Sequence, residues 1–152
     1  HFESIINSIK NGKVDAGVLL HEGQILFQKD GLTKISDLGE LWHENTGLPI
    51  PLGVDLVNRK FDEKTRKDLT TVFYKSVKYG IENEDAALKY AMQFGRDLSF
   101  EEARKFVRMY VNSDTLSLGA EGRDAILKLF NLAFEKNIIN QKPVIDIMHP
   151  KY

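Results

Sequence analysis

The sequence predicts an α/β protein in which a few strands come first and helices make up the remainder. The first observation is a run of small and apolar residues, Val14 to Leu20, whose continuous apolarity is typical of a strand covered on both faces. The second is a pair of prolines within residues 48–53, which force the residues before them into extended backbone. The third is the helical spacing of apolar residues from Asp62 onward.

Length and composition are those of an ordinary globular protein, and they exclude several classes of function. The chain has 152 residues, of which 42% are hydrophobic, so it can form one domain or two small lobes with a buried core. Lys and Arg number 21 against 22 Asp and Glu, which argues against a protein that binds nucleic acid by neutralising phosphates. The lack of cysteine excludes a disulfide scaffold, a thiolate zinc site and a cysteine nucleophile, and fits a reducing cytoplasm. No apolar run reaches the roughly 18 to 20 residues of a membrane span, so no membrane partner is expected.

Two predicted helices flank the predicted strand. The first stops at Asn11-Gly12, and the second is capped by Ser36 and ends near Gly47. Between them, residues 24–28 are expected to form another short strand or a loop. The apolar residues on the two helix faces are Phe2, Ile5, Ile6 and Ile9, then Leu38, Leu41 and Trp42.

An extended connection follows at residues 48–60, and Val54–Asn58 within it is predicted to be a strand. The chain then becomes helical. The first of four helices stops at Gly80, and the second is capped by Asn83 and followed by Gly95.

The last two predicted helices have distinct boundary signals. The third begins with Ser99 and Glu102 in the spacing of a capping box, and the fourth ends before Asn137, after which the tail is expected to be extended. The faces of the four helices carry Leu69, Val72, Phe73, Ser76 and Val77; Ala87, Leu88, Ala91 and Phe94; Ala103, Phe106, Val107 and Tyr110; and Ile126, Leu129, Phe130 and Ala133.

Position separates His21 from the other three histidines, which are His1, His43 and His149. It alone follows a buried apolar run at the end of a predicted strand, where ligands collect in open α/β sheets. Histidine is the first candidate for a general base near neutral pH, and the alternative is a histidine with a structural role. No metal site is expected, because His21 and Glu22 are adjacent and would point to opposite sides of a strand, and no HxxxH or HxH spacing exists.

Two further motifs have a structural and a functional interpretation. Asn112 follows the third helix, where it could cap the helix C-terminus or belong to a polar cluster that faces a cleft. Gly119 to Gly122 lacks the GK[ST] ending of a phosphate-binding loop, so a turn at the entry to a helix is the preferred interpretation.

Four segments together carry a family resemblance. They are GKVDAGVLLHEG at residues 12–23, DLGELW at 37–42, TGLPIPLG at 46–53, and YVN at 110–112 followed by SLGAEG at 117–122. In this order they resemble the 1,4-dihydroxy-6-naphthoate synthase family of the futalosine route to menaquinone. The combination of LLHE with TGLPxPLG is the specific part, and the resemblance runs over nearly the whole chain.

The resemblance implies a fold like that of type II periplasmic binding proteins, in which two α/β lobes flank a cleft and two extended crossings join them. This chain would be the C-terminal part. Residues 1–53 would form the end of the second lobe with the catalytic histidine motif, residues 54–60 the crossing strand, and residues 61–152 a helical segment that packs on the first lobe. The sequence also starts without Met, and a missing N-terminal half, or a separate chain that supplies it, is the expected partner.

The resemblance also implies a reaction. The family is a carbon–carbon lyase that cleaves cyclic dehypoxanthinyl futalosine and leaves 1,4-dihydroxy-6-naphthoate, without a metal or an organic cofactor. A histidine at the place of His21 in the motif accepts the proton, so His21 is expected to be the general base. Glu22 is a candidate orienting group, and Pro51, Leu52 and Gly53 are candidates for a wall of the substrate cleft. A homodimer is left open, and no nucleic acid or membrane partner is expected.

Two other functions compete with the lyase. One is the related chorismate dehydratase of the same pathway, which shares the fold; the His-Glu pair after the predicted strand favours the synthase. The other is a solute-binding lobe without catalysis. Such proteins need an export signal, and the first residues of the sequence do not contain one.

Overall fold

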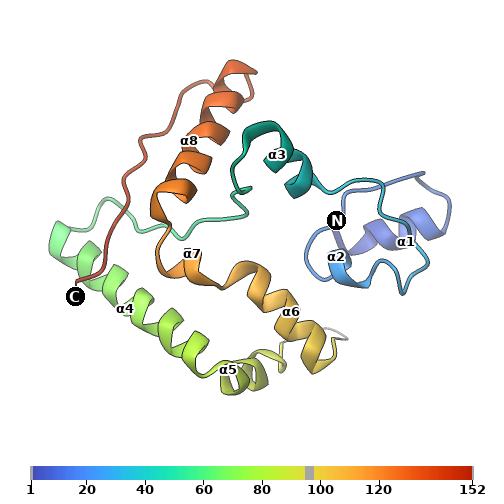
Figure 1. The fold of residues 1–152 in the computed structure, drawn as a ribbon, viewed down its shortest axis with the longest axis horizontal. Helices are drawn as coiled ribbons and strands as arrows, with labels where there is room; N and C mark the ends of the chain where they lie inside the picture. The colour runs from blue at the N-terminus through green and yellow to red at the C-terminus, as the bar shows by residue number, and fades with distance from the viewer. Residues whose placement is uncertain (1, 95–97, 152) are drawn as a thin grey trace. The chain divides into compact units, whose positions relative to one another are not determined.

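The computed structural model describes residues 2–94 and 98–151, and the regular structure in this part of the chain is helical (Figure 1). The chain divides into two compact units. The first unit is His1–Ser36 with Leu88–Met109, and the second is Asp37–Ala87 with Tyr110–Tyr152. The helices are the 3₁₀ helix η1 (Phe2–Ser4) and the α-helices α1 (Ile5–Lys10), α2 (Gly23–Leu26), α3 (Leu38–Thr46), α4 (Glu63–Glu82), α5 (Glu84–Ala91), α6 (Phe100–Tyr110), α7 (Ser113–Leu116) and α8 (Gly119–Glu135).

In the first unit, α1 packs its apolar face against the segment that leads to His21. A Cβ atom added to Gly17 would lie 2.5 Å from Ile5 Cγ2, so the chain passes directly against the helix at this glycine. The Cβ position of Gly23 lies 3.7 Å from Ile6 Cδ1, an ordinary contact. The face predicted for the first helix is therefore the surface that supports residues 17–23.

The two predicted strands, Val14–Leu20 and Val54–Asn58, are wrong for this structure. Neither segment forms a ladder, and Val18 and Leu56 are 59% and 89% exposed. A strand needs a neighbour that pairs with its N–H and C=O groups, and no strand occurs anywhere in residues 2–94 and 98–151. Of the predicted α/β class, the structure shows the helices, while the sheet and the two-lobe arrangement stay predictions.

A short helix replaces the strand or loop predicted at residues 24–28. In α2 the N–H groups of Ile25 and Leu26 donate to the carbonyl of Glu22, at 2.9 and 3.0 Å. A further turn follows, in which Lys29 N–H donates to the carbonyl of Leu26 at 2.9 Å. The segment after His21 is therefore a sequence of tight turns, which bonds internally and needs no partner strand.

In the second unit, α3 is confirmed with a different capping residue. The cap is Asp37 rather than Ser36, because its carboxylate accepts from the N–H groups of Gly39 and Glu40, at 2.8 and 3.2 Å. The helix ends at Gly47, whose φ of +70° suits glycine. Trp42 Nε1 then donates to the carbonyl of Pro49 at 3.0 Å and ties the extended segment back onto α3.

Helix α4 is longer than predicted. It is capped by Asp62, which accepts from Thr65 N–H at 2.9 Å and Thr65 Oγ1 at 2.8 Å, and these hydrogen bonds lower the pKa of Asp62. The predicted stop at Gly80 is wrong, since the helix continues to Glu82. A glycine inside a helix costs only about 1 kcal/mol relative to alanine, too little to end a long helix.

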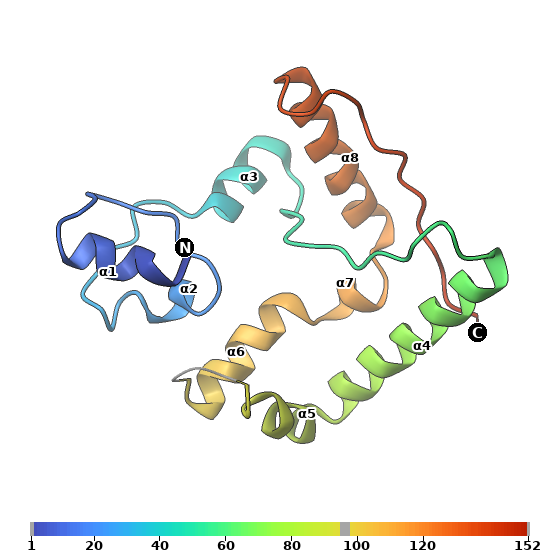
Figure 2. The ribbon, with the colours of Figure 1, turned by 180° about the vertical axis from the view of Figure 1, so that it is seen from behind.

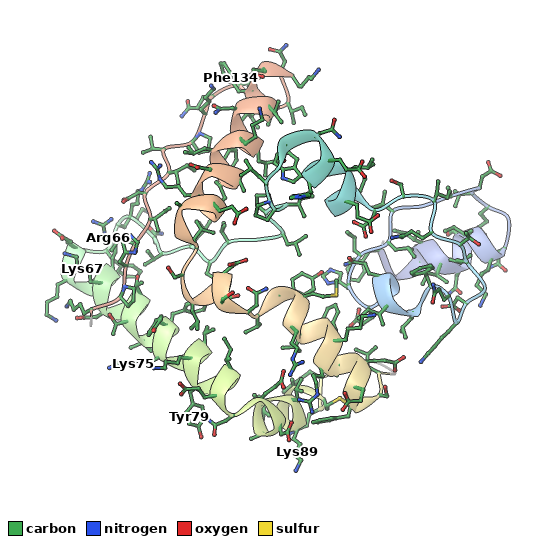
Figure 3. The ribbon with its side chains drawn as sticks, viewed as in Figure 1. Arg66, Lys67, Lys75, Tyr79, Lys89 and Phe134 are labelled. Atoms are coloured by element: carbon green, nitrogen blue, oxygen red, sulfur yellow. The ribbon has the colours of Figure 1, made fainter. Side chains whose placement is uncertain are left out.

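The C-terminal tail returns from α8 to α4 within the second unit (Figure 2). Lys151 Nζ lies 2.6 Å from Asp68 Oδ1, and Lys151 N–H donates to Thr71 Oγ1 at 2.9 Å. Earlier in the tail, Asp146 Oδ2 lies 3.8 Å from Arg66 Nη1 of α4. Arg66 and Lys67 are in the first turns of α4, and Lys75 and Tyr79 follow farther along it (Figure 3).

The remaining predicted helices are confirmed with changes at their ends. The side chain of Asn83 donates to the carbonyl of Tyr79 at 2.9 Å at the end of α4, and the carbonyl of Asn83 accepts from Ala87 N–H at 3.0 Å at the start of α5. Helix α5 ends at Ala91, which leaves Phe94 beyond it and exposed, and Gly95 lies outside the described residues. Helix α8 ends at Glu135, before Asn137 as predicted.

The buried core expected from the composition is small within each unit. Among the described residues, the buried apolar side chains are Leu88 and Ala103 in the first unit and Ala125 and Ile126 in the second. Several residues predicted for the core face of α4 are exposed, among them Leu69, Val72 and Phe73. The apolar faces predicted by spacing are present, but this chain alone does not cover them.

Candidate functional site

His21 occupies a tight turn with an unusual backbone. Its φ is +53°, in the left-handed region, and among the described residues other than glycine only Asn137 shares this feature. A residue without glycine's freedom pays a conformational cost there, and such positions concentrate at functional sites. The carbonyl of His21 accepts from Gln24 N–H at 3.2 Å, so the turn leads directly into α2.

The ring of His21 is exposed and rests against Phe2. The two ring centroids are 4.7 Å apart and the planes are tilted by 47°. Phe2 belongs to the same apolar face as Ile5 and Ile6, which contact the chain before and after the histidine. The exposed imidazole therefore has an aromatic ring on one side.

Glu22 follows the histidine as the residue before α2. Its side chain is half-buried and makes no capping hydrogen bond to the helix, while its main-chain carbonyl accepts from α2. Because the chain turns here instead of continuing as a strand, strand alternation does not set the direction of Glu22. Its role as an orienting group stays a prediction.

Leu52 and Gly53 belong to the extended segment of the second unit. Both residues are exposed, and a Cβ atom at Gly53 would meet nothing within 4 Å. Their predicted place in a cleft wall, and that of the half-buried Pro51, stay predictions, because they lie in a different unit from His21.

An ion pair joins the turn after α2 to the start of α6, within the first unit. Lys29 Nζ contacts Glu102 Oε1, and Glu102 Oε2 accepts from Ser99 N–H at 2.9 Å and Ser99 Oγ at 2.7 Å. The predicted capping box of Ser99 and Glu102 is thereby confirmed. The hydrogen bonds from Lys29 and then Ser99 lower the pKa of Glu102 to about 2.

Asn112 caps the helix that follows it, and its predicted role at the C-terminus of α6 stays a prediction. Its Oδ1 accepts from Asp114 N–H at 2.9 Å, and its own N–H donates to Thr115 Oγ1 at 3.2 Å, so it starts α7. The alternative interpretation of Asn112, a polar cluster facing a cleft, stays a prediction. Gly119 and Gly122 lie in the first turn of α8, which agrees with the predicted helix entry.

In residues 2–94 and 98–151 no three His, Asp or Glu side chains gather in a way that could hold a metal ion. None of the helices in this part of the chain combines the length and apolarity needed to cross a membrane.

The sequence predicts His21 as a site residue but does not predict the groups that the structure places around it. The ring contact from Phe2 could have been inferred, because Phe2 lies on the predicted face of the first helix. The pairing of Lys29 with Glu102 has no sequence signal, since 73 positions separate the two residues.

The matching family model and the curated relatives agree on menaquinone biosynthesis. The family model described as menaquinone biosynthesis matches residues 1–135. Proteins named 1,4-dihydroxy-6-naphthoate synthase from Thermus thermophilus and Streptomyces coelicolor are each 33% identical, over 93% and 91% of this chain and 52% and 49% of their own length. A crystal structure of an Archaeoglobus fulgidus protein superposes with a TM-score of 0.87 and 36% identity, over 91% of this chain and 52% of that one. The chain thus spans about half the length of the curated relatives it matches.

Proposed function

We propose, because this chain belongs to the menaquinone biosynthesis family, that it is the histidine-bearing part of an enzyme that converts cyclic dehypoxanthinyl futalosine to 1,4-dihydroxy-6-naphthoate. The curated relatives named for this product support the choice of reaction over the related dehydratase and over a binding protein without activity. The observation that carries the proposal is His21, exposed in a left-handed turn with its ring against Phe2.

In the proposed reaction His21 is the general base. Its imidazole removes a proton from a substrate hydroxyl, whose oxygen forms a C=O group as the adjacent carbon–carbon bond breaks. The electron pair of that bond passes into the ring system, which gains aromaticity as the three-carbon fragment leaves. A positioned base contributes typically about 10²- to 10⁴-fold to such a step. The ring of Phe2 supports the imidazole from one side and leaves the other side free for the hydroxyl.

The proposal also includes the fold and the partner. The helices of this chain would be part of a two-lobe protein like the type II periplasmic binding proteins, with the substrate between the lobes. The remaining half, continuous with this chain or a separate polypeptide, would cover apolar residues that are exposed here on α4, such as Leu69, Val72 and Phe73. We use the term complete enzyme for this chain together with that half.

The proposed base is tested by substitution in the complete enzyme. We expect His21→Asn to lower kcat about 10²- to 10⁴-fold, because asparagine cannot accept the proton yet tolerates a positive φ. The measurement is steady-state conversion of the cyclic substrate, followed through the naphthoate product. The matched control is His43→Asn, at an exposed histidine of α3, which should keep kcat within about twofold of the unmodified enzyme. Near-native turnover by folded His21→Asn would show that another group is the base.

A further inference from the structure

The turn that follows His21 is anchored at its far end by charged side chains. Lys29 and Asp30 are consecutive in this turn. Lys29 reaches Glu102 on α6, and Asp30 Oδ1 lies 2.8 Å from Lys10 Nζ at the end of α1. The turn is therefore fastened to a helix on either side, while the His21 end rests on Phe2.

Glu102 is the better oriented of these anchors. Its side chain is only 20% exposed, and one carboxylate oxygen accepts from both the N–H and the hydroxyl of Ser99. These two hydrogen bonds fix the plane of the carboxylate, so the other oxygen presents to Lys29 in a set direction. A flexible lysine that meets a fixed carboxylate loses its own freedom of position.

The anchor lies close to the histidine along the chain. Helix α2 and the turn after it lie between His21 and Lys29. Both are closed by main-chain hydrogen bonds, whose donors are N–H groups of residues within the range from Gly23 to Gly31. A short segment bonded in this way moves largely as one body, so displacement of Lys29 is transmitted to the turn that carries His21.

We propose that Glu102, through Lys29, is a positioning residue that holds the His21 turn in place against Phe2. The expected effect on catalysis rests on the proposed function, whereas the effect on the placement of the ring does not. An exposed ion pair contributes little to stability, and Lys29 is itself exposed, so its removal should alter geometry while the unit stays folded. The pair therefore sets a direction, and the unit should stay folded at neutral pH when it is lost.

Three variants of the complete enzyme test this inference. Lys29→Met removes the charge but keeps a long side chain, and Lys29→Arg restores a cation. The matched control is Lys67→Met, which removes an exposed lysine paired with Glu63 on α4, in the other unit. We expect Lys29→Met to lower kcat roughly tenfold with KM nearly unchanged, because a displaced base impairs the chemical step more than binding. Lys29→Arg should recover most of the loss, and Lys67→Met should show none.

A second measurement is independent of activity. The ring of Phe2 shifts the proton resonances of the His21 imidazole in NMR spectra. The spectrum of Phe2→Leu shows where these resonances lie when the aromatic ring is absent. We expect the His21 resonances of Lys29→Met to move toward those of Phe2→Leu, and those of Lys67→Met to stay in place. If the unmodified enzyme does not convert the substrate, the proposed function fails while this readout still decides the inference. Unchanged His21 resonances in Lys29→Met, or an equal change in Lys67→Met, would overturn it.

Discussion

His21 combines a reactive side chain with a backbone that most side chains avoid. At a φ of +53° the Cβ atom crowds the main chain, and β-branched residues suffer most, while asparagine and histidine are comparatively tolerant. The turn therefore has a side chain that can carry a proton in a place where glycine would fold more easily. Loss of function at this position and loss of folding must be separated by the choice of substitution.

We expect the substitutions at His21 to rank by backbone tolerance in the complete enzyme. His21→Asn should change the free energy of unfolding by less than about 0.5 kcal/mol, and His21→Val should lower it by about 1 to 2 kcal/mol. Denaturant unfolding of both variants measures the difference. An equal loss for both would mean that the lost contact with Phe2, rather than the backbone, determines the cost.

Two glycines are expected to respond in opposite directions to alanine. Gly17→Ala places a Cβ atom 2.5 Å from Ile5 Cγ2, and isoleucine is stiff, so overpacking should lower the free energy of unfolding by about 1 to 3 kcal/mol. Gly80→Ala enters open space inside α4 and should raise it by about 0.5 to 1 kcal/mol. Thermal unfolding of the two variants makes the comparison, and stabilisation by Gly17→Ala would contradict the close approach of α1.

At the scale of elements, the start of α6 depends on the capping box of Ser99 and Glu102, and Glu102 gives it a pH dependence. Hydrogen bonds from Lys29 and Ser99 hold its pKa at about 2, below the usual 4.5. A carboxyl group with a lowered pKa in the folded state stabilises that state above its unfolded pKa, and the stabilisation is lost as the pH falls toward the folded pKa. The sensitive window therefore lies between about pH 4.5 and pH 2.

We expect Glu102→Gln to remove this part of the pH dependence. The free energy of unfolding of the unmodified enzyme should fall more steeply than that of the variant as the pH is lowered through this window, and the two curves should converge at its acid end. Urea unfolding at a series of pH values provides the measurement. Parallel curves would mean that the hydrogen bonds of Glu102 do not distinguish the folded state from the unfolded state.

Helices proved predictable because their signals are local. The spacing of Phe2, Ile5 and Ile6 specified both a helix and the face it uses, and the capping box of Ser99 and Glu102 specified a helix start. The end of α4 was misplaced because one glycine is a weak stop. The strand at Val14–Leu20 was misplaced because its apolar pattern presupposes partner strands that the described residues do not provide.

The candidate site was predictable to the same local extent. His21 could be singled out by its place after an apolar run and by the family resemblance. Its turn could not, because the segment was expected to end as a strand, and a positive φ at histidine has no sequence signature. The Lys29 and Glu102 pair depends on the folded path of the first unit, which no pattern within either segment specifies.

At the scale of the whole molecule, the surface is too large for the mass. The accessible area is 11456 Å² for 17.3 kDa, whereas a compact protein of this mass exposes about 7,800 Å² and two separate globules of half the mass about 9,400 Å². The accessible area of this chain exceeds both values. Large apolar side chains contribute to the exposed surface, as on α4, where Val72 is 66% exposed. Exposed apolar faces of this extent favour association.

We therefore expect this chain, produced alone, to be inactive and to self-associate or bind a hydrophobic dye. Produced together with the half that its relatives possess in addition, it should form a complex that copurifies, unfolds cooperatively and converts the substrate. Sedimentation, dye fluorescence and turnover of the two preparations make the comparison. A substitution on α4 tests the same expectation more sharply. Val72→Asp, at an exposed apolar residue, should prevent formation of the complex, while Lys75→Asp, on the same helix (Figure 3), should not. A monodisperse monomer of the lone chain with a cooperative transition would show that its helices need no cover, and turnover without the second half would show that His21 and the groups around it suffice for the reaction.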